Sequence, residues 1–120
     1  MWYILNTFYR KFISHFHHLY KPPDKYCKHT KQHESIVTAL KEAKPILDAT
    51  GVTIMIEPLN TLFNHPGYYL WSAVEGFDII REVGHPLVKV VYDIYHQQIM
   101  EGNIIRNVVN NLQYIEHLHS

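Results

Sequence analysis

The 120-residue sequence has a single cysteine, Cys27, and no hydrophobic stretch that approaches the roughly 20 residues needed to span a bilayer. A lone cysteine cannot form an internal disulfide, which is typical of chains from a reducing compartment. The opening residues lack the basic region and uninterrupted apolar region of a secretory signal, because Asn6, Arg10 and Lys11 divide them. We therefore expect a cytoplasmic chain that does not bind membranes.

The sequence also lacks an excess of charge of either sign, because its 11 basic and 11 acidic residues cancel. A neutral chain offers no general electrostatic attraction for nucleic acid or for anionic membranes. The sequence also has no glycine-rich phosphate loop, no Walker pattern and no Gly-x-Ser-x-Gly elbow. Nucleotide binding and serine hydrolysis are therefore unsupported. Ten histidines make the net charge sensitive to mild acid.

Three short apolar runs, each ending in a side chain that can bind a metal ion, organise the rest of the sequence. The runs cover residues 52–57, 88–93 and 114–119. Runs of this kind between helical segments are typical of buried strands in a parallel sheet, where functional residues gather at the carboxyl ends. The pattern predicts that Glu57, Asp93 and His119 meet at one rim. Two carboxylates and an imidazole suit a divalent metal ion such as Mg²⁺ or Mn²⁺.

Helical patterns separate these runs. Apolar residues at helical spacing predict a helix over about residues 32–49, in which Pro45 should cause a kink or a local interruption and Gly51 a stop. Ser72 and Glu75 have the spacing of a capping box at the start of a second helix that ends near Val83. Residues 97–102 are expected to be a loop, and a third helix should follow from Asn103. The alternation of helix and strand indicates an α/β fold with parallel strands.

Residues 1–30 form an atypical N-terminal segment, for which we expect a helix and then a loop. Apolar side chains recur at helical spacing over residues 1–20, which predicts an amphipathic helix. A helix packed on the protein's own core, or a segment not native to the fold, is favoured over a membrane-surface or partner-binding helix, because the basic face is weak. A structural zinc site at Cys27, His29 and His33 is not favoured, since a second pair of ligands is missing.

Residues 31–120 resemble the hydroxypyruvate isomerase group of the xylose isomerase-like TIM barrels. Four motifs, in matching order and separation, carry this resemblance. They are Ile-Glu-Pro-Leu-Asn at 56–60, His-Pro-Gly-Tyr-Tyr-Leu at 65–70, Tyr-Asp-Ile-Tyr-His at 92–96 with Gln-Ile-Met-Glu-Gly at 98–102, and His-Leu-His at 117–119. The resemblance implies a partial (β/α)8 barrel, with three parallel strands that correspond to strands five to seven and their helices.

The resemblance also implies roles for the residues at the rim. Glu57, Asp93 and His119 would bind a divalent metal ion, Glu57 would also transfer a proton, and His96 would contact oxygen atoms of a small hydroxy-carbonyl or sugar substrate. A second glutamate of the family site belongs to strand eight, which would lie beyond Ser120. We therefore expect a fragment of an aldose–ketose isomerase that is inactive alone, and the sequence leaves open whether this chain is itself an enzyme.

Several interpretations remain open at this point. A sugar epimerase of the same superfamily fits the motifs equally well, whereas an apurinic endonuclease is disfavoured by the neutral charge. A non-catalytic remnant is the alternative from another class, and exposed sheet edges would allow it to self-associate. His117, two residues before His119, is expected in the core or behind the ligands. Glu101 is expected to be solvated or to lie at a helix N-terminus.

Overall fold

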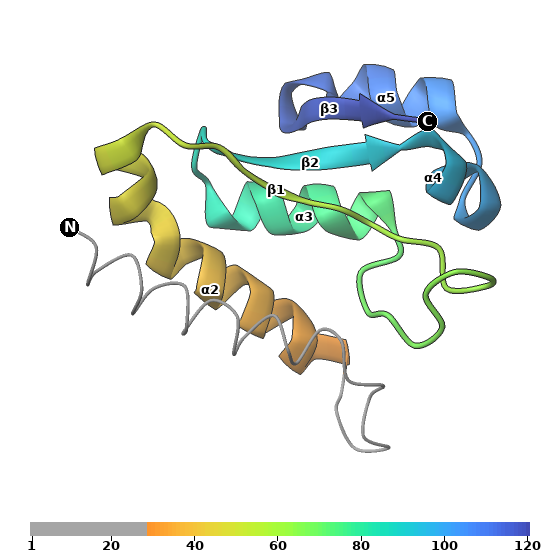
Figure 1. Ribbon diagram of the computed structural model, residues 1–120, viewed down its shortest axis with the longest axis horizontal. Coiled ribbons are helices and arrows are strands. Elements are labelled where there is room, and N and C mark those ends of the chain that lie inside the picture. Colours follow the sequence, from red (N-terminus) through yellow and green to blue (C-terminus); the bar gives the residue numbers. More distant parts are fainter. Residues whose placement is uncertain (1–28) are drawn as a thin grey trace.

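The computed structural model describes residues 29–120, so the helix predicted for residues 1–20 and the interpretation of Cys27 lie outside the described residues. The predicted alternation of helices and strands is confirmed there (Figure 1). The elements are α2 (His29–Thr50), β1 (Ile54–Ile56), α3 (Ala73–Val83), β2 (Val88–Asp93), α4 (Ile94–Met100), α5 (Ile104–Asn111), a 3-10 turn η1 (Leu112–Tyr114) and β3 (Ile115–His119).

The three strands form one parallel sheet in the order β1-β2-β3. Ile56 of β1 pairs with Val90 of β2, and Asp93 of β2 pairs with His119 of β3. The register shifts by one residue between Val90 and Val91, so β3 is displaced relative to the first part of β2. Because all three strands run in the same direction, their carboxyl ends lie at one edge of the sheet.

The hydrophobic core lies between the sheet and the helices α2 and α3, which Figure 1 shows on one side of the strands. Alternate residues of β2 face these helices, because side chains of a strand alternate between the two faces. Val88, Val90 and Tyr92 are therefore fully buried, and the ring of Phe77 from α3 stacks on Tyr92 with 6.3 Å between centroids. The opposite face of β2 carries Asp93 at its end.

Pro45 does not interrupt helix α2, which contradicts the expected local interruption. The helix continues through Pro45 to Thr50 and ends at Gly51, which has φ +70° and donates its N–H to the carbonyl of Leu47. Pro45 is exposed, so water can reach the backbone carbonyl that its missing N–H leaves unpaired. Leu40, Ala43 and Leu47 anchor the buried face on both sides of the proline.

Helix α3 has the predicted start and end but only half of the predicted capping box. The Ser72 hydroxyl accepts a hydrogen bond from the Glu75 N–H at 3.2 Å, as the motif requires. The Glu75 carboxylate, however, is bonded to Tyr69 and His33. Glu101 lies at this helix N-terminus instead, where its carboxylate accepts from the Ser72 hydroxyl at 2.5 Å and from the Ala73 N–H at 3.2 Å. This position agrees with one of the two roles expected for Glu101.

Residues 97–102 are not simply a loop, because helix α4 covers Ile94–Met100. Asp93 caps this helix, since its Oδ1 atom accepts the His96 N–H at 3.2 Å. The Asp-x-x-His spacing is therefore a local helix signal as well as a site motif. Helix α5 follows as expected, but Ile105, Val109 and Leu112 are mostly exposed, at 82%, 68% and 60%.

Candidate functional site

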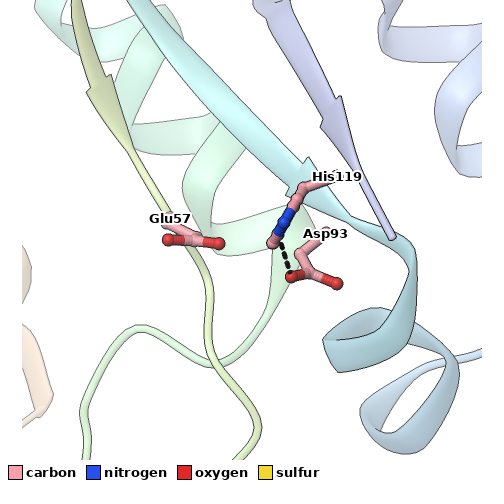
Figure 2. A group of neighbouring side chains, drawn as sticks. All are labelled: Glu57, Asp93 and His119. Atoms are coloured by element: carbon pink, nitrogen blue, oxygen red, sulfur yellow. Dashed lines mark hydrogen bonds and ion pairs between the residues drawn. The ribbon is translucent and has the colours of Figure 1, made fainter.

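Glu57, Asp93 and His119 meet at the carboxyl edge of the sheet (Figure 2). Glu57 directly follows β1, and Asp93 and His119 are the last residues of β2 and β3. One potential ligand atom from each side chain lies within 4.8 Å of the others. Asp93 is buried, Glu57 is half-buried and His119 is exposed, so the group is open to solvent on one side. The three strands thus bring together residues that are far apart in the sequence.

The carboxylate of Asp93 is the centre of this group. Its Oδ2 atom accepts a hydrogen bond from His119 Nδ1 at 2.8 Å, the dashed line in Figure 2. Its Oδ1 atom accepts the His96 N–H. Burial alone would raise the pKa of Asp93, but the hydrogen bonds from His119 and from the His96 backbone outweigh it, so the pKa lies below the usual value. Asp93 is therefore ionised at neutral pH.

The composition and spacing of this group fit a divalent metal ion. Mg²⁺ and Mn²⁺ prefer carboxylate oxygens and accept imidazole, and all three donors here are of these types. Donor atoms at roughly 2.1 Å from one ion lie about 3 Å apart when adjacent and about 4.2 Å apart when opposite. The ligand atoms lie within 4.8 Å of one another, so they would move closer together to bind one ion directly. Coordination through His119 Nδ1 would replace its hydrogen bond to Asp93.

His96 lies beside this group and is held by Asn60. His96 is buried, and its Nε2 atom is 3.8 Å from Asp93 Oδ2. Its Nδ1 atom is within hydrogen-bond distance of the Asn60 backbone N, at 3.1 Å, and of Asn60 Nδ2, at 2.7 Å. The rings of His65 and Tyr95 flank it, with centroids at 5.6 and 5.2 Å. His96 is therefore fixed in orientation with one edge toward Asp93.

Gln97 connects the segment after β1 to helix α3, a role that the sequence analysis does not predict. Its side chain is fully buried. Its amide nitrogen donates to the carbonyls of Pro58 and Trp71, at 3.2 and 3.3 Å, and its amide oxygen accepts the Ala73 N–H at 3.2 Å. Since Pro58 directly follows Glu57, these bonds help to fix where Glu57 leaves the strand. A lone glutamine after a site motif gives no sequence signal of such a connection.

His117 differs from the expectation of a core or buried position. It pairs with Val91 in the register of the sheet, and its ring stacks on His119 with 6.2 Å between centroids, so the two imidazoles lie on the same face of the strand. However, His117 is exposed. The sheet face that carries it has no covering element among residues 29–120, whereas the other face is covered by α2 and α3.

None of the helices within residues 29–120 combines the length and the hydrophobicity required to cross a membrane.

A comparison with protein families matches residues 8–120 to the xylose isomerase-like TIM barrel family. This match begins well before residue 31, where the motif resemblance starts. It includes all of β1, β2 and β3 and therefore every candidate site residue.

Individual proteins support the same assignment. Hydroxypyruvate isomerase of Escherichia coli is 34% identical over 86 residues, which are 72% of this chain and 33% of that protein. Among solved structures, the family 2 AP endonuclease of Brucella melitensis superposes with a TM-score of 0.72 at 30% identity, covering 78% of this chain and 36% of that one. D-Psicose 3-epimerase of Clostridium cellulolyticum H10, solved with D-tagatose, gives a TM-score of 0.68 at 32% identity, covering 82% and 34%.

The chain spans about a third of the length of the curated relatives it matches. Its three parallel strands with interleaved helices correspond to part of the barrel of the solved neighbours. The family match over residues 8–120, together with this architecture, establishes that the chain belongs to the xylose isomerase-like TIM barrel family.

Proposed function

We propose that this chain carries part of the divalent-metal site of an aldose–ketose isomerase similar to hydroxypyruvate isomerase. The observation that carries the proposal is the convergence of Glu57, Asp93 and His119, whose ligand atoms lie within 4.8 Å at one rim. The relatives named hydroxypyruvate isomerase agree with this chemistry. The proposed substrate is a small hydroxy-carbonyl compound or sugar.

The chemistry gives each of these residues a task. Interconversion of a hydroxyaldehyde and a hydroxyketone moves a proton between adjacent carbons through an enediolate. A bound divalent cation would stabilise the negative charge on the enediolate oxygens. Glu57, which is half-buried at the rim, would remove the proton as a general base and return it to the neighbouring carbon. Glu57, Asp93 and His119 would hold the cation, and His96 would contact a substrate oxygen.

An epimerase is the second candidate, and the solved D-psicose 3-epimerase is the observation that favours it. Epimerisation next to a carbonyl uses the same proton abstraction, but the proton returns to the opposite face of the same carbon. The candidate site residues of this chain do not by themselves distinguish the two reactions. Incubation with a ketohexose and with hydroxypyruvate, followed by product analysis, distinguishes them. An endonuclease is less favoured, although the Brucella melitensis neighbour is an AP endonuclease, because this chain is electrically neutral.

A non-catalytic role through self-association is the candidate from a different class. Ile105 and Val109 of α5, Leu112 of η1 and Leu118 of β3 are exposed apolar side chains. Strands β1 and β3 are the edges of the sheet among the described residues. Exposed edges and apolar surface favour association. Size-exclusion chromatography with light scattering tests this role. A cooperatively unfolding monomer would argue against it.

The decisive experiment for the metal site is calorimetric titration of the full 120-residue chain with Mn²⁺. We expect weak, saturable binding that Glu57→Gln reduces at least about tenfold, because the substitution removes a ligand charge. Glu116→Gln is the matched control, since Glu116 is an exposed glutamate on β3 outside the ligand group. Absence of binding in a chain that circular dichroism shows to be folded would overturn the proposal. Equal effects of the two variants would do the same.

A further inference from the structure

Asn60 contacts His96 in a way that defines which ring nitrogen carries the proton. The Asn60 backbone N–H donates to His96 Nδ1 at 3.1 Å. A backbone N–H can only donate, so Nδ1 must be an acceptor without a proton. Both groups are buried, which keeps water from competing for this bond. This contact favours a neutral imidazole whose proton is on Nε2.

The side chain of Asn60 reinforces the same arrangement. Its Oδ1 atom accepts the backbone N–H groups of Phe63 and Asn64, both at 3.1 Å. Because these groups also can only donate, the amide oxygen must face them and the amide nitrogen must face the other way. Asn60 Nδ2 then donates to His96 Nδ1 at 2.7 Å and to Asn64 Oδ1 at 2.7 Å. The loop geometry thus fixes the amide, and the amide fixes the imidazole.

The opposite edge of the ring is directed to the candidate site. His96 Nε2 lies 3.8 Å from Asp93 Oδ2, beyond a normal hydrogen bond. We propose that Asn60 is a positioning residue, which holds His96 in the Nε2–H tautomer so that His96 donates a hydrogen bond to a substrate oxygen and does not act as a general base. Glu57 is then the proton-transferring group of this chain.

The proposal rests on the proposed isomerase function for the identity of the acceptor. A carbonyl or hydroxyl oxygen of a hydroxy-carbonyl substrate gains negative charge in the enediolate, and a donor at Nε2 stabilises that charge. An imidazole with an unprotonated Nε2 would instead repel it. The tautomer of His96 therefore decides whether this residue helps or opposes the proposed chemistry.

Asn60→Asp is the most informative substitution, because it keeps the shape of the side chain but changes its hydrogen-bond donor into an acceptor. The new carboxylate still accepts the N–H groups of Phe63 and Asn64, so the turn is retained. However, an oxygen replaces the donor that faces Nδ1 and favours a proton on that nitrogen. Asn110→Asp is the control, since Asn110 is exposed on α5 and the substitution adds the same charge.

The test is long-range ¹H–¹⁵N correlation NMR of the histidine side chains in the full chain at pH 8. The His96 signals, among those of ten histidines, are assigned by their loss in His96→Gln. We expect the high-frequency ¹⁵N shift of an unprotonated nitrogen at Nδ1 in the unmodified chain and in Asn110→Asp. In Asn60→Asp this shift should move toward the protonated range. A protonated Nδ1 in the unmodified chain would overturn the proposal, whether or not Asn60→Asp folds. So would an unchanged Nδ1 shift in a folded Asn60→Asp.

This result is separable from the proposed function. If the unmodified chain fails to bind Mn²⁺ in the calorimetric titration but shows the Nε2–H tautomer, the metal-site proposal fails and the positioning role of Asn60 stands. If the chain binds Mn²⁺ but Nδ1 is protonated, the inference about Asn60 fails alone.

Discussion

His119 Nδ1 donates a hydrogen bond to Asp93 Oδ2 across 2.8 Å, between the last residues of two neighbouring parallel strands. The bond holds an exposed imidazole against a buried carboxylate at the position where a metal ion would bind. Coordination of a metal ion through His119 Nδ1 would therefore have to break this hydrogen bond.

The first prediction concerns the metal ligands. Asp93→Asn should lower the affinity for Mn²⁺ by about tenfold or more, because it removes the central negative charge of the group. His117→Gln should change the affinity little. His117 contacts the His119 ring, but it lies two residues before His119 on β3, opposite Val91 and away from the rim. Calorimetric titration of both variants measures this difference. Equal losses of affinity would show that the ligand group does not form the metal site.

The second prediction concerns turnover. The ligand group among residues 29–120 offers three side chains, and the chain spans about a third of the relatives' length. We expect negligible conversion of hydroxypyruvate to tartronate semialdehyde by the 120-residue chain in the presence of Mn²⁺. A coupled assay for the aldehyde product checks this. Robust turnover that Glu57→Gln abolishes would prove the prediction wrong.

The third prediction concerns pH and the packing of α2 on α3. His33 bridges two carboxylates of α3, with Nδ1 at 2.7 Å from Glu75 and Nε2 at 2.9 Å from Glu82. Partial burial alone would lower the pKa of His33, but the two hydrogen bonds outweigh it and raise the pKa. Burial would likewise raise the pKa of Glu75, but hydrogen bonds from Tyr69 and His33 lower it.

The sign of the pH dependence follows from these two shifts. A raised pKa means that the His33 contribution to stability is complete below about pH 6.5 and is lost as the pH rises through the folded-state value. A lowered pKa means that the Glu75 contribution is complete above about pH 4.5 and is lost in stronger acid. The pair should therefore stabilise the fold most between these limits.

Denaturant unfolding at pH 5.5 and pH 8.5 measures the effect. His33→Gln should reduce the pH-dependent part of the unfolding free energy by about 1 kcal/mol, the scale of a partly exposed charged hydrogen bond. His117→Gln is the control, because His117 is exposed on β3, remote in the fold from the contact of α2 with α3. An identical pH dependence of the unmodified chain and His33→Gln would contradict the assignment.

The fourth prediction concerns the buried amide of Gln97. Gln97→Leu leaves the carbonyls of Pro58 and Trp71 and the N–H of Ala73 with fewer partners, which should cost about 1–3 kcal/mol of unfolding free energy. Gln98→Leu, on the exposed side of the same helix, should change it by less than about 0.5 kcal/mol. Urea denaturation of the two variants gives the comparison, and similar costs would indicate that the Gln97 hydrogen bonds add nothing.

The sequence predicted the elements that depend on local pattern, and it failed where several groups compete. Glycine at position 51 and the helix start at Ser72 were correctly identified, because each depends on backbone conformation or on one nearby side chain. Glu75 was assigned to a capping box, but Tyr69 and His33 compete for its carboxylate and Glu101 takes its place. The helical turn of α4 was missed because Asp93 was interpreted as a ligand alone, although it also caps this helix.

The sequence by itself determined that Glu57, Asp93 and His119 would end three parallel strands, because a strand period of two residues and the strand–helix–strand alternation leave few other arrangements. Only the tertiary structure decided how the side chains around that rim are oriented. The hydrogen bonds from Asn60 to His96, and those of Gln97 with Pro58 and Ala73, join residues 24 to 39 positions apart. Such contacts depend on how a buried polar group finds a partner when the chain packs, which no local pattern encodes.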